Sequence, residues 1–266
     1  MPARALALVL FLNGFAGCSS ATGGGELPVR SVLFVGNSLT YTNDLPELFT
    51  RVARAARDSA RVGMAADANL AVIDHTNGAT DALDRIDAGD WGFVVLQQGP
   101  TPAGICRDTL IIAAMRFAPH VRAAGGRVVL FLPWTRQPNP GGLAVASESA
   151  TLAARAAGGV AAPVGLAWKL ALEADPTLPL YGSDGYHPAP AGSLLAALTI
   201  YARLSGRDVR ALPTADLAGI ITPALTPAQL ERLATAAHAA AASLPPDPVE
   251  PVPADTIHLS AGGGPC

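Results

Sequence analysis

Two short segments of the sequence carry residues suited to acyl transfer. In the first, Ser38 follows an apolar run and a glycine, so its hydroxyl would emerge where a buried strand ends. In the second, Asp184 lies three residues before His187, a spacing that lets one short turn hold both side chains on the same side. A serine hydroxyl attacks a carbonyl well only when a base removes its proton and an acidic group orients that base. We therefore predict that Ser38, His187 and Asp184 act together as nucleophile, base and orienting acid.

Each of these residues also has a purely structural interpretation. A serine after a strand often caps a helix or lies in a turn, and Asp184 with His187 could cap the helix expected to begin at Pro188. His75 is the main rival base because it also follows a predicted strand, but the adjacent Asp74 is expected to point to the opposite face. We interpret His75 as a structural or cleft-lining residue. The other histidines lie in predicted helices or in the C-terminal tail, at His120, His238 and His258.

Composition and charge argue against several other functions. The 266 residues carry a formal net charge of -3, without a basic stripe, an aromatic-rich RNA motif or zinc-finger spacing, so no nucleic-acid partner is expected. The glycine and serine of the first segment form neither a P-loop nor a G-x-S-x-G nucleophile elbow. We expect no metal site and no cofactor.

The elements that must position these residues alternate between strands and helices. Apolar runs predict five strands, at residues 32–35, 68–73, 93–96, 127–132 and 160–164. Helices are expected at about 45–60, capped by Asn43 or Asp44, and at 188–204 and 227–242. This alternation predicts an α/β fold, a three-layer α/β/α sandwich around a parallel, flavodoxin-like five-stranded sheet. The active site should lie at the carboxyl ends of the strands, beside a topological switch point.

The N-terminus has the pattern of an export signal. Arg4 precedes an apolar run that is too short to span a bilayer as a permanent helix. The tetrad Phe15-Ala16-Gly17-Cys18 resembles a bacterial lipobox, which makes Cys18 the predicted lipidation site. We therefore predict an exported lipoprotein that contacts the membrane of the cell envelope through its lipid anchor only. Ordinary secretory cleavage, which would leave a secreted or periplasmic protein, is the alternative.

The predicted domain organisation follows from these composition changes. Cys106 and Cys266 would remain in the mature chain, where export permits a disulfide. We assign the signal peptide to residues 1–18, a flexible tether to 19–29, one folded domain to 30–243 and a Pro- and Gly-rich tail to 244–266.

Two segments stand out as possible family motifs: residues 35–41 read Val-Gly-Asn-Ser-Leu-Thr-Tyr, and residues 184–188 read Asp-Gly-Tyr-His-Pro and are followed by Gly192. They resemble the first and the last motif blocks of the SGNH/GDSL hydrolases. The similarity extends over about residues 31–207 and includes 94–98 and 133–134. Members of this family hydrolyse esters, thioesters or acetylated carbohydrates without a metal, through a triad in the chain order Ser, Asp, His. The resemblance thus implies a serine esterase whose partner is a small-molecule or carbohydrate ester.

The resemblance also implies an oxyanion hole. The family takes its donors from the N–H of the nucleophile, the N–H of a glycine in the second block and the side chain of an asparagine in the third. Ser38 and Gly78 are the corresponding candidates for the first two. The third block has no asparagine here, and Gln97, with Gln98 as the alternative, is the candidate because a glutamine amide donates the same hydrogen bond.

Three functional hypotheses follow. The first is hydrolysis of a carboxylic ester, including acetyl groups on carbohydrate, through an acyl-enzyme intermediate. The second is a non-catalytic carbohydrate-binding lipoprotein that retains the fold, which the missing third-block asparagine motivates. The third is a phosphate-ester hydrolase, which should show a metal requirement or a basic pocket. Trp134 and Arg136 follow a predicted strand and could border the same cleft, where the tryptophan would either stack on substrate or pack into the protein.

Overall fold

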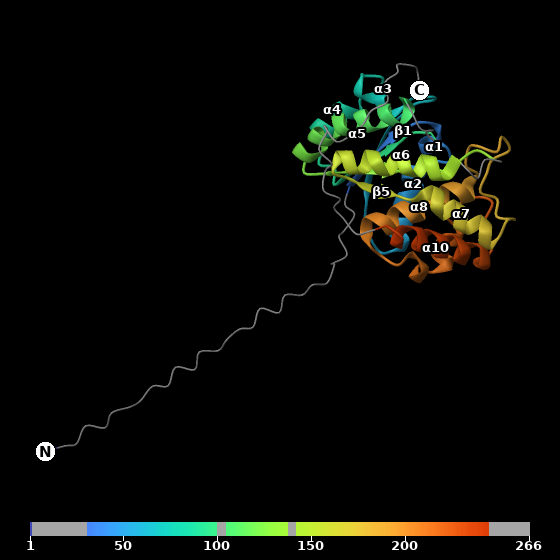
Figure 1. Cartoon of the computed structure of the whole chain (residues 1–266). Helices are drawn as coiled ribbons and strands as arrows, with labels where there is room; N and C mark the ends of the chain where they lie inside the picture. The colour runs from blue at the N-terminus through green and yellow to red at the C-terminus, as the bar shows by residue number, and fades with distance from the viewer. Residues whose placement is uncertain (2–30, 100–104, 138–141, 245–266) are drawn as a thin grey trace.

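The computed structural model describes residue 1 and residues 31–99, 105–137 and 142–244 (Figure 1). The predicted lipobox with Cys18, the tether and nearly all of the predicted tail lie outside these residues, as does His258. In the described part of the chain, no helix combines the length and the hydrophobicity needed to cross a membrane. Cys106 is disulfide-bonded, and the other two cysteines of the chain lie outside the described residues.

A five-stranded parallel sheet forms the centre of the molecule. Its strands are β1 (Ser31–Gly36), β2 (Arg61–Ala66), β3 (Phe93–Gln97), β4 (Arg127–Phe131) and β5 (Val160–Ala162). They lie in the order β2-β1-β3-β4-β5, so the direction of winding reverses between β1 and β3. This order confirms the predicted flavodoxin-like sheet, and it places the topological switch point at the carboxyl end of the strand that leads to Ser38.

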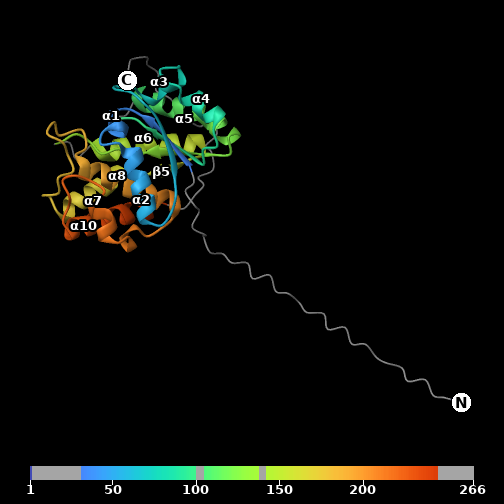
Figure 2. The same cartoon turned by 180° about the vertical axis from the view of Figure 1, so that it is seen from behind.

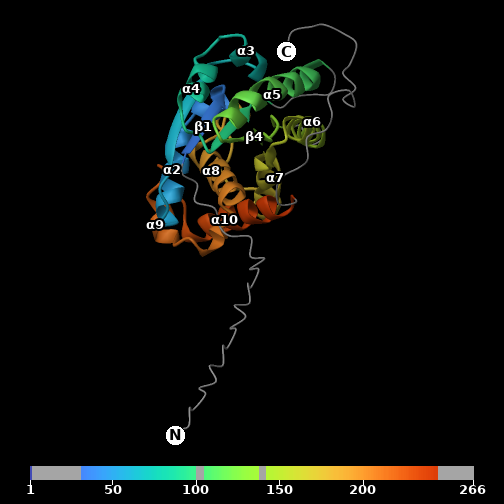
Figure 3. The same ribbon diagram turned by 90° about the vertical axis from the view of Figure 1, so that its left-hand side faces the viewer.

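Helices cover both faces of the sheet (Figures 1, 2 and 3). Alternate side chains of each buried strand point to opposite faces, so Val32 and Phe34 join one hydrophobic cluster while Leu33 and Val35 join the other. The first cluster packs against α2 (Leu45–Ala55), α7 (Val164–Ala174), α8 (Pro190–Ser205), α9 (Thr214–Ala218) and α10 (Pro227–Ala242), with a short 3-10 helix at Val209–Ala211. The second packs against α3 (Val72–Thr76), α4 (Ala82–Ala88), α5 (Ile105–Ala123) and α6 (Gly142–Ala157).

The second strand differs from its prediction. Residues 68–73 are not a strand: β2 lies earlier, at Arg61–Ala66, and residues 72 and 73 form the first turn of α3. β2 is an edge strand with mostly exposed or half-exposed side chains, so it lacks the continuous apolar run that marks a buried parallel strand. The helix predicted at 45–60 is shorter for the same reason, since α2 must end at Ala55 for the chain to enter β2.

Two glycines permit close approaches that matter for the site. A Cβ on Gly36 would lie 2.5 Å from Thr40 Oγ1 and 2.6 Å from Gln97 Oε1. A Cβ on Gly192 would overlap the Leu180 carbonyl oxygen and lie 2.5 Å from a ring carbon of Trp168. Only glycine therefore allows β1 to approach the end of β3, and α8 to approach the segment that precedes it.

Candidate active site

Ser38 lies at the carboxyl end of β1, on the first residue of a one-turn helix, α1 (Ser38–Tyr41). Asn37 caps this helix by accepting a hydrogen bond from the Leu39 N–H through its side-chain oxygen (3.2 Å). The Ser38 N–H has no acceptor among the described residues. The predicted nucleophile thus combines a half-buried hydroxyl with a free backbone donor at the edge of the sheet.

Asp184 and His187 lie on a tight loop that precedes α8. The loop is closed at its base by an antiparallel bridge between Tyr181 and Pro188, in which the Gly182 N–H donates to the His187 carbonyl (2.7 Å). Gly185 supports the turn with a left-handed backbone (φ 64°), a conformation in which glycine is not strained. The spacing of three residues therefore brings the two side chains together, as predicted.

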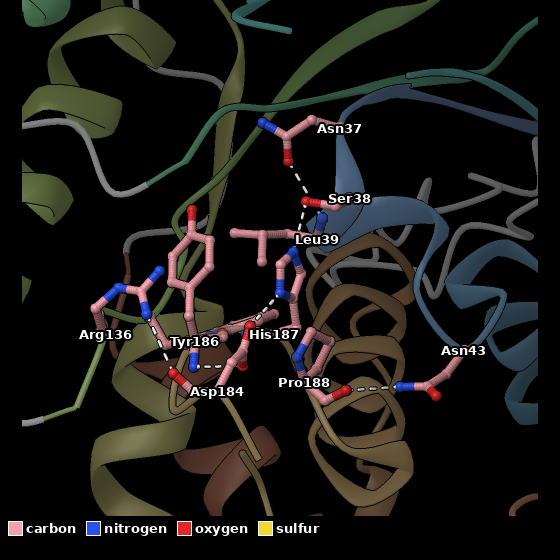
Figure 4. A network of polar contacts seen from close by, with 10 residues as sticks. Asn37, Ser38, Leu39, Asn43, Arg136, Asp184, Tyr186, His187 and Pro188 are labelled. Atoms are coloured by element: carbon pink, nitrogen blue, oxygen red, sulfur yellow. Dashed lines mark hydrogen bonds and ion pairs between the residues drawn. The ribbon is translucent and has the colours of Figure 1, made fainter. Parts of the chain in front are cut away.

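The three side chains form a continuous hydrogen-bonded chain (Figure 4). His187 Nε2 lies 2.9 Å from Ser38 Oγ, and His187 Nδ1 lies 2.5 Å from Asp184 Oδ2. The other oxygen of Asp184 accepts from the N–H groups of Tyr186 and His187, each at 2.9 Å. Ser38 and His187 are 149 residues apart in sequence, so only the fold brings them together.

The electrostatics of the loop favour one tautomer of His187. The hydrogen bond from the His187 side chain, together with the Tyr186 N–H, lowers the pKa of Asp184 to about 2. Because an ionised carboxylate can only accept, His187 carries its proton on Nδ1 and presents the lone pair of Nε2 to the Ser38 hydroxyl. The side chains of His187 and Asp184 are 40% and 43% exposed, so solvent reaches the site.

The segment that follows β4 braces the Asp184–His187 loop from one side. The guanidinium of Arg136 lies 4.5 Å above the ring of Tyr186, and the Tyr186 ring also packs edge-on against the His187 ring, with ring centres 5.1 Å apart. Hydrogen bonds join the two segments: Trp134 Nε1 to the Tyr186 carbonyl (2.9 Å), the Gln137 N–H to the Gly185 carbonyl (2.9 Å), Arg136 Nη1 to the Asp184 carbonyl (3.1 Å) and the Tyr181 hydroxyl to the Thr135 carbonyl (2.8 Å).

Trp134 packs into the protein. Its side chain is 1% exposed and stacks on Trp168, with ring centres 4.0 Å apart and planes 5° from parallel. Of the two interpretations of this residue, stacking on substrate or packing, the structure therefore favours packing. Trp134 supports the loop through its indole N–H.

The two candidate glutamines have different surroundings. Gln97 is fully buried, and its Oε1 accepts from the Asn37 N–H (2.9 Å) and the Thr40 hydroxyl (2.8 Å). Its Nε2 is buried and has no hydrogen-bond partner in the described part of the chain. Gln98 Oε1 instead accepts from the Val72 N–H at the start of α3 (3.1 Å). Gln97, rather than Gln98, therefore contacts the turn that carries Ser38.

The hydrogen bonding of Gly78 argues against its assignment as an oxyanion donor. It follows α3, and its N–H donates to the His75 carbonyl (3.3 Å), so this donor is already engaged. The assignment assumed a strand that ended at residue 73, whereas β2 ends at residue 66. The loop that directly follows β2 is attached to the nucleophile turn, because Asn37 Nδ2 donates to the Leu70 carbonyl (2.9 Å). In this loop the N–H groups of Asn69 and Leu70 have no acceptor among the described residues.

His75 is a buried structural residue, 1% exposed. Its Nε2 lies 3.1 Å from the Gly36 carbonyl and its Nδ1 lies 2.7 Å from Thr80 Oγ1, so neither nitrogen is left to act as a base for Ser38. His120 and His238 pair with the surface carboxylates of Asp87 and Asp208. The described residues contain no group of three or more His, Cys, Asp or Glu side chains arranged to hold a metal ion.

Burial makes His75 a source of pH-dependent stability. Burial lowers the pKa of this imidazole, an effect that the Gly36 carbonyl opposes only in part. In the unfolded chain this histidine has its ordinary pKa of about 6.5, so below that pH the unfolded chain binds more protons than the folded protein does. The free energy of unfolding should therefore fall as the pH drops below that value. The loss from this residue is at most about 1.4 kcal/mol at pH 5.5. Urea unfolding of wild type and His75→Gln at pH 7.5 and 5.5 tests this. The difference in unfolding free energy between the two proteins should shrink at the lower pH, and a difference that stays constant would contradict the prediction.

Sequence reasoning missed Asn43, to which it gave only a capping role. Asp44 is the cap of α2, while Asn43 Nδ2 donates to the Pro188 carbonyl (Figure 4) and to Ser193 Oγ, both at 2.9 Å. The acceptors lie 145 and 150 residues away, so no local pattern identifies them. The only sequence signal is the residue type, because Asn and Asp tolerate the left-handed backbone that Asn43 adopts (φ 58°).

No protein-family model matches the chain, and no curated protein sequence matches it. Solved structures do. A DUF4886-family protein from Bacteroides uniformis is similar with a TM-score of 0.65 at 17% identity, covering 79% of this chain and 94% of that one. A proposed SGNH hydrolase from Slackia heliotrinireducens is similar with a TM-score of 0.53 at 25% identity, covering 65% of this chain and 97% of that one. A proposed GDSL-like lipase from Parabacteroides merdae is similar with a TM-score of 0.51 at 14% identity, covering 67% of this chain and 96% of that one.

These neighbours confirm the resemblance drawn from the motifs. The chain has the fold of the SGNH/GDSL hydrolases. The neighbour at 25% identity is described as a proposed SGNH hydrolase, which agrees with the hydrolase class that the motifs imply.

Proposed function

We propose that this protein hydrolyses carboxylic esters, including acetyl esters of carbohydrates, with Ser38 as nucleophile. The observation that carries the proposal is the continuous chain from Asp184 through His187 to Ser38, at hydrogen-bond distances of 2.5 and 2.9 Å. A nucleophile, a base and an orienting acid in this arrangement are what acyl transfer at a carbonyl requires.

The proposed reaction has two steps. Ser38 Oγ attacks the ester carbonyl while its proton passes to His187 Nε2, and the imidazolium is stabilised by the carboxylate of Asp184. His187 then protonates the leaving alcohol, which leaves the acyl group on Ser38. In the second step a water molecule gives a proton to His187 and attacks the acyl-enzyme, and the acid is released as Ser38 regains its proton.

The oxyanion formed in both steps needs backbone or amide donors. We propose the Ser38 N–H as the first, since it has no acceptor among the described residues. An N–H of the 67–71 loop is the proposed second donor in place of Gly78, because this loop is bonded to Asn37. Gln97 remains the proposed third, through its buried Nε2, which has no hydrogen-bond partner among the residues that the structure describes. Removal of one such donor typically costs about 2.7 to 4 kcal/mol of transition-state stabilisation.

Covalent labelling tests the proposal without a guess at the substrate. A fluorophosphonate probe reacts with an activated serine, so it should label the wild-type protein and leave Ser38→Ala unlabelled. Ser183→Ala is a matched control, because Ser183 precedes Asp184 on the same loop but makes no hydrogen bond with the triad. Absence of labelling in the wild type, with binding of a glycan that is not cleaved, would instead support the non-catalytic carbohydrate-binding protein.

A further inference from the structure

Asn43 connects the two halves of the candidate triad. Its Nδ2 donates to the carbonyl of Pro188, the residue directly after His187, and to Ser193 Oγ in the first turn of α8 (both 2.9 Å). Asn43 itself lies just beyond α1, the short helix that begins with Ser38. One amide therefore links the nucleophile helix to the residue that follows the base (Figure 4).

A second contact strengthens this connection. Thr42, which ends α1, donates its N–H to the Ser38 carbonyl (3.0 Å), and its own carbonyl accepts from Ser193 Oγ (3.4 Å). Ser193 is 1% exposed, so its hydroxyl cannot exchange these partners for bulk water. Asn43 is exposed and these hydrogen bonds are partly buried, but they converge on the buried Ser193 hydroxyl, which would lose its partners if the two segments moved apart.

We propose that Asn43 is a positioning residue that sets the separation between Ser38 Oγ and His187 Nε2. The proposal rests on the function proposed above, in which these two atoms exchange a proton. Asn43 does not touch the reacting atoms. It acts by holding the end of α1 against Pro188 and α8, so that the base lies within hydrogen-bond reach of the nucleophile.

The left-handed backbone of Asn43 decides which variants are informative. Asn43→Gly removes the amide and tolerates the positive φ, and Asn43→Asp keeps the shape but replaces the donor with an acceptor. Arg57→Gly is the matched control: Arg57 is also left-handed (φ 58°), its side chain is exposed, and it lies beyond the far end of α2.

The experiment compares kcat and KM for a short-chain aryl ester with the rate of fluorophosphonate labelling. Both Asn43 variants should lower kcat and the labelling rate by about 10- to 100-fold, because a misplacement of about 1 Å costs up to 10²-fold. KM should change less than about twofold, since no substrate contact is lost. Ser193→Ala should give a smaller loss, and the loss in the double variant should be smaller than the two single losses combined, because the hydrogen bond between Asn43 and Ser193 is removed by either change.

Several outcomes separate this inference from the proposed function. If the wild type is labelled but the Asn43 variants behave like Arg57→Gly, the positioning role is wrong. A drop in unfolding free energy with kcat per folded molecule unchanged would also overturn it. If the wild type is unreactive, a crystal structure of Asn43→Gly still decides: the Ser38 Oγ to His187 Nε2 separation should exceed hydrogen-bond reach, and an unchanged separation would refute the proposal.

Discussion

His187→Ala is expected to lower kcat for a short-chain aryl ester by about 10⁶-fold, because members of such a triad act as one unit and removing the base costs nearly the whole effect. His75, which contacts the end of β1 through the Gly36 carbonyl, has both ring nitrogens engaged, so it cannot replace His187. Steady-state kinetics of the purified protein, with titration of the active fraction, measures the loss.

The non-additivity of the triad gives this prediction its sharpest control. Ser38→Ala should cause a loss of similar size, and the double variant should be no worse than either single variant. His120→Ala is the matched control, since His120 also pairs with an aspartate, Asp87, at 2.8 Å but on the surface. Losses that multiply in the double variant would show that Ser38 and His187 do not act on the same step.

Asp184→Asn is expected to lower kcat by about 10⁴-fold with little change in KM. The asparagine oxygen can still accept from the N–H groups of Tyr186 and His187, so the loop should keep its shape. Its amide nitrogen, however, would face His187 Nδ1 as a donor. The imidazole would then carry its proton on Nε2 and could no longer accept the proton of Ser38.

The pH profile is a further test of the role of Asp184. With a pKa of about 2, the Asp184 carboxylate stays ionised throughout an assay range of pH 5 to 9, so its own titration should not shape the wild-type profile. The loss in Asp184→Asn should therefore persist across that range. Asp87→Asn, which changes the partner of His120, is the control and should leave kcat unaltered. A loss below about tenfold would contradict the assigned role.

Local pattern was sufficient for the parts of the protein whose interactions are local. Asp184 and His187 are three residues apart on one turn, so their pairing follows from spacing and is observed at 2.5 Å. The four buried strands were predictable because a parallel strand covered on both faces must be apolar throughout. β2 was not predictable in this way, because most of its side chains are exposed or half-exposed, and the misplaced second strand led to the choice of Gly78 as a donor.

The tertiary structure decided the relationships between segments that are distant in sequence. The sequence by itself determined the residue types of the triad, the alternation that builds a parallel sheet and the position of Ser38 after its first strand. Only the fold decided the different contacts of the two glutamines: Gln97 accepts from the nucleophile turn, and Gln98 accepts from the start of α3. The reason is that the pleat and register of β3 set the face to which each side chain points. The same holds for Asn43, whose two acceptors lie about 150 residues away and approach it only when α1 and α8 pack at the same edge of the sheet.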